Sequence, residues 1–499
     1  MDVWLKRLGV HRGAPRLFLD AAQAVRAGFC PGERFDVRID GHAVVLTKLA
    51  NGARIVSARR KDDEVLPVID INSKELLGAF EGMHSVRVVV GQECVYILPL
   101  ASELKKRERL GRVTGKLARG EALSTGSLAH GGGVLSHAIH QGLHDAGVDA
   151  NLVFVNELRE DLIEHACRVN DAWTSQGPGR TAALVVPMQE AVQDEWLMGR
   201  LPLLEVLEMG LPCSGASRAG VAKRGLAKME DHPSVGHLVF AALVFISKTQ
   251  PAVVLLENVV DYRSCASAQI LRQQLQDMGY DLHEAVLEGA DFGALENRVR
   301  WVLVAVTHGV EFDFDRLQPT ARVVTRLRDV LDEVADDDPR WSEMSHLFAK
   351  QERDRSKGSN FKMQVLTEEA TGVPTLRKGY SKGGSTDPVL RHPTREHLMR
   401  RLSAAEHARV KGVPDHLIES LSQTQAHQLL GQGIVYEPFR AVGQRIGVRL
   451  RQAAQRLRPD DNVVEMTPDQ GSGAQPPDQE PAQEDFSSAV SWRRTRMVG

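Results

Sequence analysis

The sequence lacks the features of a membrane or secreted protein. No apolar run approaches the roughly 18 residues that can span a bilayer, and residues 1–6 are too short and polar for a signal peptide. The five cysteines show neither metal-ligand spacing nor a paired framework. We therefore expect a cytoplasmic protein with no membrane partner and no metal, in a reducing compartment that keeps a catalytic thiol reduced.

Basic residues are missing from one long segment of the sequence. Residues 460–485 contain eight acidic residues and no basic one, and they are rich in proline, glutamine, glycine and serine. Such a composition cannot bury enough apolar surface to fold, which predicts a disordered acidic tail over 456–499. The whole chain has 499 residues, of which 42% are hydrophobic, and this is enough for two or three cores.

The most informative pair of residues is Pro212-Cys213, which follows an apolar stretch and opens a loop of small residues. Glu257 ends another apolar run, and Arg300 precedes a third. A thiolate that adds to C6 of cytosine makes C5 nucleophilic enough to attack a methyl sulfonium. A carboxyl group can share the proton at N3, and an arginine can hold O2. We therefore predict that Cys213, Glu257 and Arg300 act together on a cytosine ring.

Two neighbours of these residues admit more than one role. Arg298 and Arg300 alternate along an expected strand and point the same way, so Arg298 either supports Arg300 or contacts a phosphate. Asn258 is predicted to orient Glu257 and its loop, with contact to the substrate as the alternative. An inert buried thiol at Cys213 and an ordinary strand-end carboxylate at Glu257 are the structural alternatives.

These residues resemble the motifs of the DNA (cytosine-5) methyltransferases. The resemblance covers about 123–306 and 396–446. It implies an α/β fold with a Rossmann-like, doubly wound, mostly parallel sheet, S-adenosylmethionine as methyl donor, and a cytosine flipped out of the helix. The matching segments are Pro212-Cys213 with Ser217 and Gly220, Glu257-Asn258-Val259, residues 289–293, residues 296–300, residues 401–415 as the ninth motif, and residues 431–435 as the tenth.

The resemblance also implies a cofactor site. Residues 127–136 stand where the family has Phe-x-Gly-x-Gly, and glycines let a backbone approach a ligand closely. Glu157, at the end of an expected strand, is the predicted ligand of the ribose hydroxyls. The remaining cofactor residues are Leu128, Gly131, Gly132, Gly133, Gly431 and Gln432. Departures from the family pattern are Leu128 for an aromatic, Pro187-Met188 for an acid, Ser214 and Glu296 for Gln, and Gln432 for Asn.

The segment 309–395 lies between matched motifs, matches none itself, and is predicted to recognise the target sequence. Its turn-rich stretches could place lysines on phosphates and other side chains on base edges. Residues 396–455 then complete the small domain and the catalytic domain of 121–308. The expected DNA contacts are Lys357, Lys362, Lys378, Tyr380 and Lys382, with Ser217 from the nucleophile loop.

Residues 1–100 are predicted to form a β-rich accessory module, joined to the rest by a basic linker over 101–120. The strand pair at 35–46 recurs at 86–97, which indicates an internal repeat. The first copy resembles the swapped-hairpin domains of AbrB-type and SymE-like proteins, so two copies would form the equivalent of one dimer. A plain accessory module and a DNA-contacting module both remain open.

We expect a DNA cytosine-5 methyltransferase acting on double-stranded DNA, with a restriction endonuclease as a candidate partner. One alternative is an RNA (tRNA) cytosine-5 methyltransferase, which substrate preference would separate. The other is a non-catalytic DNA-binding regulator with a degenerate methyltransferase domain, which S-adenosylmethionine binding would separate.

Overall fold

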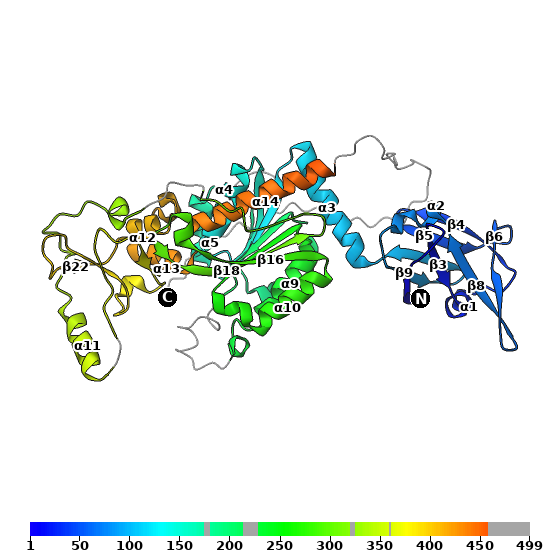
Figure 1. Cartoon of the computed structure of the whole chain (residues 1–499), viewed down its shortest axis with the longest axis horizontal. Helices are drawn as coiled ribbons and strands as arrows, with labels where there is room; N and C mark the ends of the chain where they lie inside the picture. The colour runs from blue at the N-terminus through cyan, green and yellow to red at the C-terminus, as the bar shows by residue number, and fades with distance from the viewer. Residues whose placement is uncertain (174–179, 213–227, 320–324, 359–360, 458–499) are drawn as a thin grey trace, which may run out of the picture. The chain divides into compact units, whose positions relative to one another are not determined.

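The central feature of the computed structural model is a seven-stranded sheet with strand order β13-β12-β11-β14-β15-β18-β16 (Figure 1). All neighbours run parallel except β18, which is antiparallel to both β15 and β16. The order reverses between β11 and β14, where doubly wound sheets bind their ligands. The expected α/β fold is therefore confirmed. The strands are β11 (Leu123–Leu128), β12 (Ala150–Asn156), β13 (Ala182–Leu184), β14 (Val206–Met209), β15 (Val253–Asn258), β16 (Tyr280–Glu288) and β18 (Val299–Thr307).

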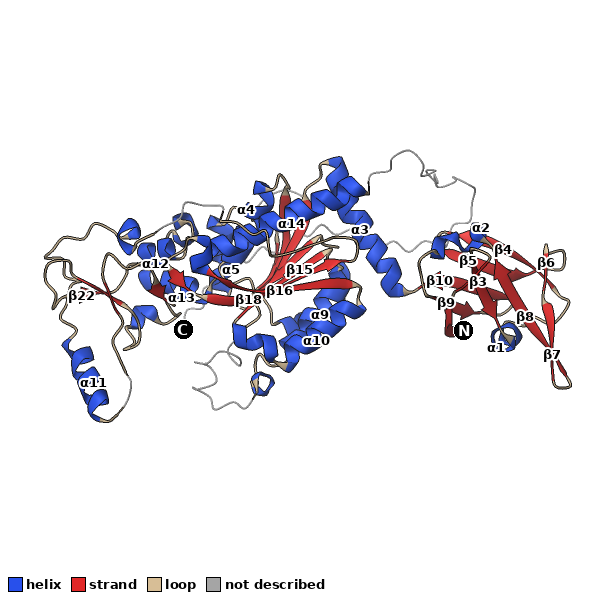
Figure 2. Cartoon of the chain, in the orientation of Figure 1, coloured by secondary structure: helices blue, strands red, loops and turns tan. Residues whose placement is uncertain are grey.

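The structure describes residues 1–173, 180–212, 228–319, 325–358 and 361–457. Figure 2 shows strands both in this central sheet and in the N-terminal part of the chain. Within the described ranges, no helix is long and apolar enough to cross a membrane.

Alternation along the strands divides the apolar side chains between two cores. Val206 belongs to the core formed with α4 and α14, whereas Leu207 belongs to the core formed with α9 and α10. The helices around the sheet are α4 (Val134–Asp145), α5 (Glu160–Val169), α6 (Met188–Ala191), α7 (Glu195–Arg200), α9 (Leu238–Thr249), α10 (Ala266–Asp277) and α14 (Tyr436–Arg456).

Helices α4 and α14 pack closely although they are far apart in the chain. A Cβ atom on Gly142 would lie 2.1 Å from the carbonyl oxygen of Arg440, and one on Gly443 would lie 2.6 Å from that of Ile139. The Arg440 side chain also pairs with Asp145 at 2.7 Å, across 295 residues of sequence. Glycine at 142 and 443 therefore allows the two backbones to touch.

The basic residues of 101–120 bind the protein itself. They lie on α3 (Ala101–Arg119), where Arg109 is fully buried and donates hydrogen bonds to three other segments of the chain. Arg112 and Lys116 both pair with the buried Glu205, at 2.8 and 2.7 Å. These three cations therefore attach α3 to the segments around the central sheet.

The N-terminal part contains two sheets, β1-β9-β10-β5-β4-β6 and β2-β3-β8-β7, with a shared core. Val45 lies opposite Tyr96, and Phe18 lies opposite Asp70. Val45 and Tyr96 are corresponding positions of the two sequence copies, 51 residues apart, as a two-fold axis between the copies requires. The likeness to swapped-hairpin domains stays a prediction. The strands are β1 (Asp2–Arg7), β2 (Gly9–His11), β3 (Ala14–Leu19), β4 (Arg34–Asp40), β5 (Ala43–Lys48), β6 (Arg54–Ile55), β7 (Ser57–Lys61), β8 (Glu64–Asn72), β9 (Ser85–Val90) and β10 (Cys94–Pro99), with helices α1 (Ala21–Arg26) and α2 (Lys74–Leu77).

The region after β18 has short strands and a small core of its own. Strand β17 from the catalytic part pairs with β20 of this region, which joins the two. The elements are β17 (Glu296–Asn297), α11 (Ser345–Ser356), β19 (Val365–Leu366), β20 (Val373–Pro374), β21 (Val389–Arg391), β22 (Met399–Arg400), α12 (Ala404–Val410) and α13 (Gln423–Gln432).

Candidate active site

A cavity of about 530 Å³ opens where β11, β14 and β15 end. Its lining joins the glycine turn after β11 with the residues around the end of β15, so the predicted cofactor and base-binding groups share one space. The predicted residues in its lining are Gly131, Gly132, Glu157, Glu257, Asn258, Arg298, Arg300, Lys378, Gly431 and Gln432.

Close packing shapes the glycine turn. A Cβ atom on Gly132 would lie 2.3 Å from Leu429 Cδ1, and one on Gly133 would lie 2.3 Å from Asn170 Nδ2. Gly131 and Gly133 also have positive φ angles of 59° and 76°, a region that glycine adopts without strain. The turn leads directly into α4. Side chains at these positions would clash or strain the backbone, so the cavity wall here is main chain.

Glu157 directly follows β12 and fixes the same turn. Its Oε2 accepts a hydrogen bond from the Gly131 amide at 2.8 Å, and its Oε1 accepts one from the Arg159 amide at 3.0 Å. Each carboxylate oxygen has a second lone pair for another donor. Glu157 can therefore hold the turn and also bind a pair of hydroxyl groups in the cavity.

Glu257 and Arg300 form an ion pair within the cavity lining. Arg300 Nε lies 2.7 Å from Glu257 Oε1, and each side chain is 15% exposed. The two come from the neighbouring antiparallel strands β15 and β18. A carboxylate and a guanidinium thus lie side by side in the cavity lining, and their predicted role at the N3 and O2 edge of a cytosine stays a prediction.

Asn258 and Arg298 make structural contacts next to this pair. Asn258 Nδ2 donates to the Leu211 carbonyl at 3.1 Å, and this residue precedes the Pro-Cys dipeptide. Arg298 precedes β18 and donates to the Gly431 carbonyl at 3.3 Å. Asn258 therefore anchors the chain that enters the predicted nucleophile loop, and Arg298 links the arginine motif to the tenth motif.

The predicted nucleophile Cys213 and its neighbour Ser217 lie outside the described residues, which stop at Pro212 and resume at Lys228. Pro212 itself lines the cavity. The described chain thus reaches the cavity at the residue immediately before Cys213.

Gly431 and Gln432 meet the recognition segment at the cavity. A Cβ atom on Gly431 would lie 2.3 Å from the Lys378 amide nitrogen, so only glycine fits there. Lys378 Nζ donates to Gln432 Oε1 at 3.0 Å. Lys378, expected to contact DNA, is therefore already bonded to a residue of the tenth motif.

Two predicted site residues face inward, and the structure corrects both expectations. Leu128, expected at the cofactor, is fully buried in the core formed with α9 and is absent from the cavity lining. Tyr380, expected at DNA, is fully buried, and its hydroxyl donates to the Pro388 carbonyl and accepts from the Leu402 amide. The side chains of Lys357, Lys362 and Lys382 are exposed, so their DNA contacts stay predictions.

The sequence did not predict two buried charged features beside the site. Glu208 lines the cavity but is only 4% exposed, and burial raises its pKa to about 8. Glu296 pairs with Lys411 at 2.8 Å, and both side chains are fully buried. An acid within the apolar stretch 201–211 was a usable signal for Glu208. No local pattern could have paired Glu296 with the distant Lys411.

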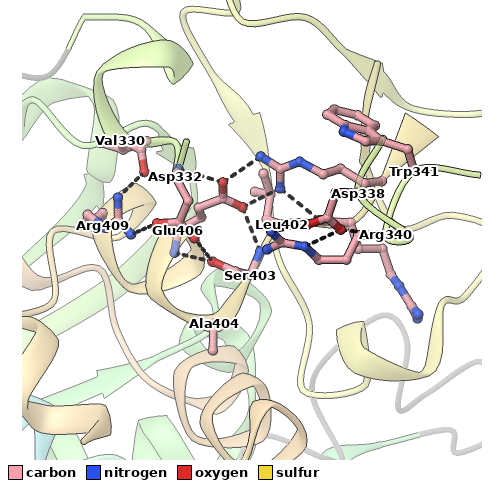
Figure 3. A network of polar contacts seen from close by, with 12 residues as sticks. Val330, Asp332, Asp338, Arg340, Trp341, Leu402, Ser403, Ala404, Glu406 and Arg409 are labelled. Carbon is pink, nitrogen blue, oxygen red and sulfur yellow. Dashed lines mark hydrogen bonds and ion pairs between the residues drawn. The ribbon is translucent and has the colours of Figure 1, made fainter. Parts of the chain in front are cut away.

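Glu406 of the ninth motif organises the region after β18 (Figure 3). It is fully buried and accepts hydrogen bonds from the Arg400 guanidinium at 2.6 and 2.7 Å. It also accepts from the amides of Asp332 and Ser403, at 2.9 and 2.7 Å. Arg409 adds bonds to Asp332 and to the Val330 carbonyl. The ninth motif therefore holds the chain around Val330 and Asp332 in place.

Comparisons with known proteins agree with this arrangement. A model of the family described as C-5 cytosine-specific DNA methylase matches residues 188–448. The type II methyltransferase M.NlaX of Neisseria lactamica is 28% identical over 265 residues, covering 51% of this chain and 80% of that protein. The type II methyltransferase M1.ScrFI of Lactococcus lactis subsp. cremoris is 25% identical, covering 49% of this chain and 63% of that protein. The crystal structure of the S. pombe Dnmt2 methyltransferase shares the fold, with a TM-score of 0.50 and 18% identity over 66% of this chain and 99% of that one.

Proposed function

The chain belongs to the family of C-5 cytosine-specific DNA methylases, and we propose that it transfers a methyl group from S-adenosylmethionine to C5 of a cytosine in double-stranded DNA. One observation carries the proposal. A single cavity holds the glycine turn with Glu157 and also the Glu257–Arg300 pair. A methyl donor and a target base bound to these two groups would therefore be neighbours.

The methyl donor S-adenosylmethionine fits the groups present at the glycine turn. S-adenosylmethionine supplies a methyl group on a sulfonium, and it carries a ribose with two free hydroxyls. Glu157 has the spare acceptor capacity to bind that diol, as acids after the second strand do in related sheets. The space beside Gly131 is open and leaves room for the methyl donor there.

The chemical steps are assigned to Cys213, Glu257 and Arg300. The Cys213 thiolate adds to C6 while Glu257 supplies a proton to N3, and Arg300 donates to O2. As the electron pair now at C5 forms the new carbon–methyl bond, the methyl–sulfur bond of the sulfonium breaks and leaves a neutral thioether. A water molecule acting as base then takes the C5 proton, the thiolate leaves C6, and N3 returns its proton to Glu257, which restores the aromatic ring. Because an intact duplex would hide C6 from a thiol, the cytosine must be flipped out of the helix.

Target choice is assigned to the segment 309–395. Its exposed Lys357, Lys362 and Lys382 can bind phosphates, which fixes position without reading sequence. Other side chains of the segment would then read base edges.

The decisive test compares two glutamate variants. Glu257→Gln should abolish transfer of labelled methyl groups to unmethylated duplex DNA, because an amide cannot supply the N3 proton. Glu284→Gln is the matched control, since Glu284 also pairs with an arginine, Arg272, at 2.6 Å but outside the cavity. Bisulfite sequencing reads the product. Methylation of a structured tRNA, with none of duplex DNA, would overturn the proposed substrate.

A further inference from the structure

Glu208 is a buried acid that the steps above do not use. It lies on β14, where its neighbours Leu207 and Met209 point into the opposite core. Its side chain therefore points to the α4 side of the sheet, directly across from Ser127 of β11. It is 4% exposed and lines the cavity beside the glycine turn. The carboxyl group thus lies next to the proposed donor site.

No cation neutralises Glu208 within the part of the chain that the structure describes. The hydroxyls of Ser127 and Ser136 favour its charged form, but its Oε1 has no hydrogen-bond partner of normal geometry. Glu205, three residues earlier, is equally buried but pairs with Arg112 and Lys116. The contrast shows that this fold supplies counter-charges to buried acids, but not to Glu208.

The titratable groups around Glu208 do not supply positive charge either. Glu257, from β15, adds negative charge. His130, in the glycine turn, is kept neutral because burial lowers its pKa to about 3. On α4, the helix that carries Ser136, burial also keeps His137 and His140 neutral by lowering their pKa values to about 4. Arg300, across the cavity, pairs with Glu257.

We propose that Glu208 is the counter-charge for a cationic group of the methyl donor, and this inference rests on the proposed function. The methionine half of S-adenosylmethionine carries two cations, the sulfonium and the α-ammonium. Either one would provide the charge that the buried carboxyl group lacks. Without the donor, Glu208 is protonated at neutral pH, because desolvation raises its pKa to about 8.

Binding of S-adenosylmethionine must therefore release the proton of the Glu208 carboxyl group. The carboxyl O–H bond breaks, the proton passes to buffer, and the carboxylate stays beside the bound cation. Because the proton leaves on binding, affinity for the donor increases as pH rises toward about 8, where free Glu208 ionises by itself. Above that pH the affinity no longer depends on this group.

Calorimetric titration of the full-length protein tests the inference. At pH 7, in phosphate and in Tris, the difference in binding heat counts released protons. The wild type should release close to one proton on binding S-adenosylmethionine. Glu208→Gln should release none and should bind about tenfold more weakly or worse. Ser136→Ala, which changes a neighbour but not the carboxyl group, should still release the proton.

S-adenosylhomocysteine separates the two cations, because it keeps the ammonium but has a neutral sulfur. If Glu208→Gln weakens both ligands, the partner is the ammonium, and if it weakens only S-adenosylmethionine, the partner is the sulfonium. Equal affinity and equal proton release in wild type and Glu208→Gln would overturn the inference and leave the proposed function standing. A wild type that binds neither ligand would instead overturn the proposed function. A melting temperature of ligand-free Glu208→Gln at or above that of the wild type excludes misfolding as the cause.

Discussion

Replacing Glu296 by glutamine should destabilise the protein, because Lys411 would lose its counter-charge in the interior. Lys411 Nζ lies 2.8 Å from Glu296 Oε2, and both side chains are fully buried. Glutamine keeps the oxygen that accepts from the Leu376 amide, so the substitution removes a charge and changes little else. Breaking a buried ion pair in this way costs about 3–5 kcal/mol.

The pH dependence gives an independent measure of the same effect. Burial, assisted by the nearby charge of Arg298, lowers the pKa of Lys411 from 10.5 to about 7. At about 1.36 kcal/mol per pKa unit, the interior disfavours the charged lysine by about 5 kcal/mol even beside Glu296. The folded pKa is below the unfolded value, so stability rises with pH between about 7 and 10.5. In Glu296→Gln this rise should begin below pH 7.

Urea unfolding followed by tryptophan fluorescence measures both effects. Glu296→Gln should lower the unfolding midpoint more at pH 6 than at pH 9, because the lone lysine can deprotonate at high pH. Adding Lys411→Gln should recover most of the loss, since two amides can hydrogen-bond without a buried charge. Glu121→Gln, which removes an exposed partner of Arg119, is the control and should not shift the midpoint. An unchanged midpoint in Glu296→Gln, or no recovery in the double variant, would refute the reasoning.

Four further predictions address the site and its support. Cys213→Ser should abolish methyl transfer but preserve DNA binding, and a 5-fluorocytosine duplex should form its covalent adduct on Cys213 when the adduct peptide is mapped. Glu157→Ala should weaken S-adenosylmethionine binding by about 1–3 kcal/mol in a titration; unchanged affinity would exclude it as the ribose ligand. Gly142→Ala should destabilise by about 1–3 kcal/mol in thermal melts, since the new Cβ would lie 2.1 Å from a carbonyl of α14, whereas Gly199→Ala has open space and should not. Exchanging 309–395 for the segment of a relative with another target should change the bisulfite pattern; an active chimera with the old pattern would place recognition elsewhere.

The sequence predicted the parts of the site that are encoded locally. Glu257 was predicted from its combination with Cys213 and Arg300, and Glu157 from its place at the end of an expected strand after a glycine turn. The doubly wound fold was implied by the resemblance of these motifs to a known family. These predictions depend only on short motifs, each of residues close together in the sequence, so one sequence is enough to make them.

Burial set by distant segments could not be predicted in the same way. Tyr380 lies in a turn-rich, basic stretch, and this stretch suggested a contact with DNA. Instead, its hydroxyl hydrogen-bonds to Pro388 and Leu402 in the interior. The basic run 101–120 was expected to be a linker, yet Glu205 of another segment pairs with two of its cations. In each case a tertiary contact far away in the sequence decides where the side chain lies.

The close fit of α4 against α14 has a consequence for synthesis on the ribosome. Helix α4 emerges early, but the glycines and apolar side chains of α14 that cover Ile139 and Leu143 emerge about 300 residues later. Until then, this face of α4 lacks the side chains of α14 that cover it and is more exposed to chaperones and proteases. The part of the chain that contains α4 and the glycine turn therefore completes its packing only after residues 309–395 have been translated.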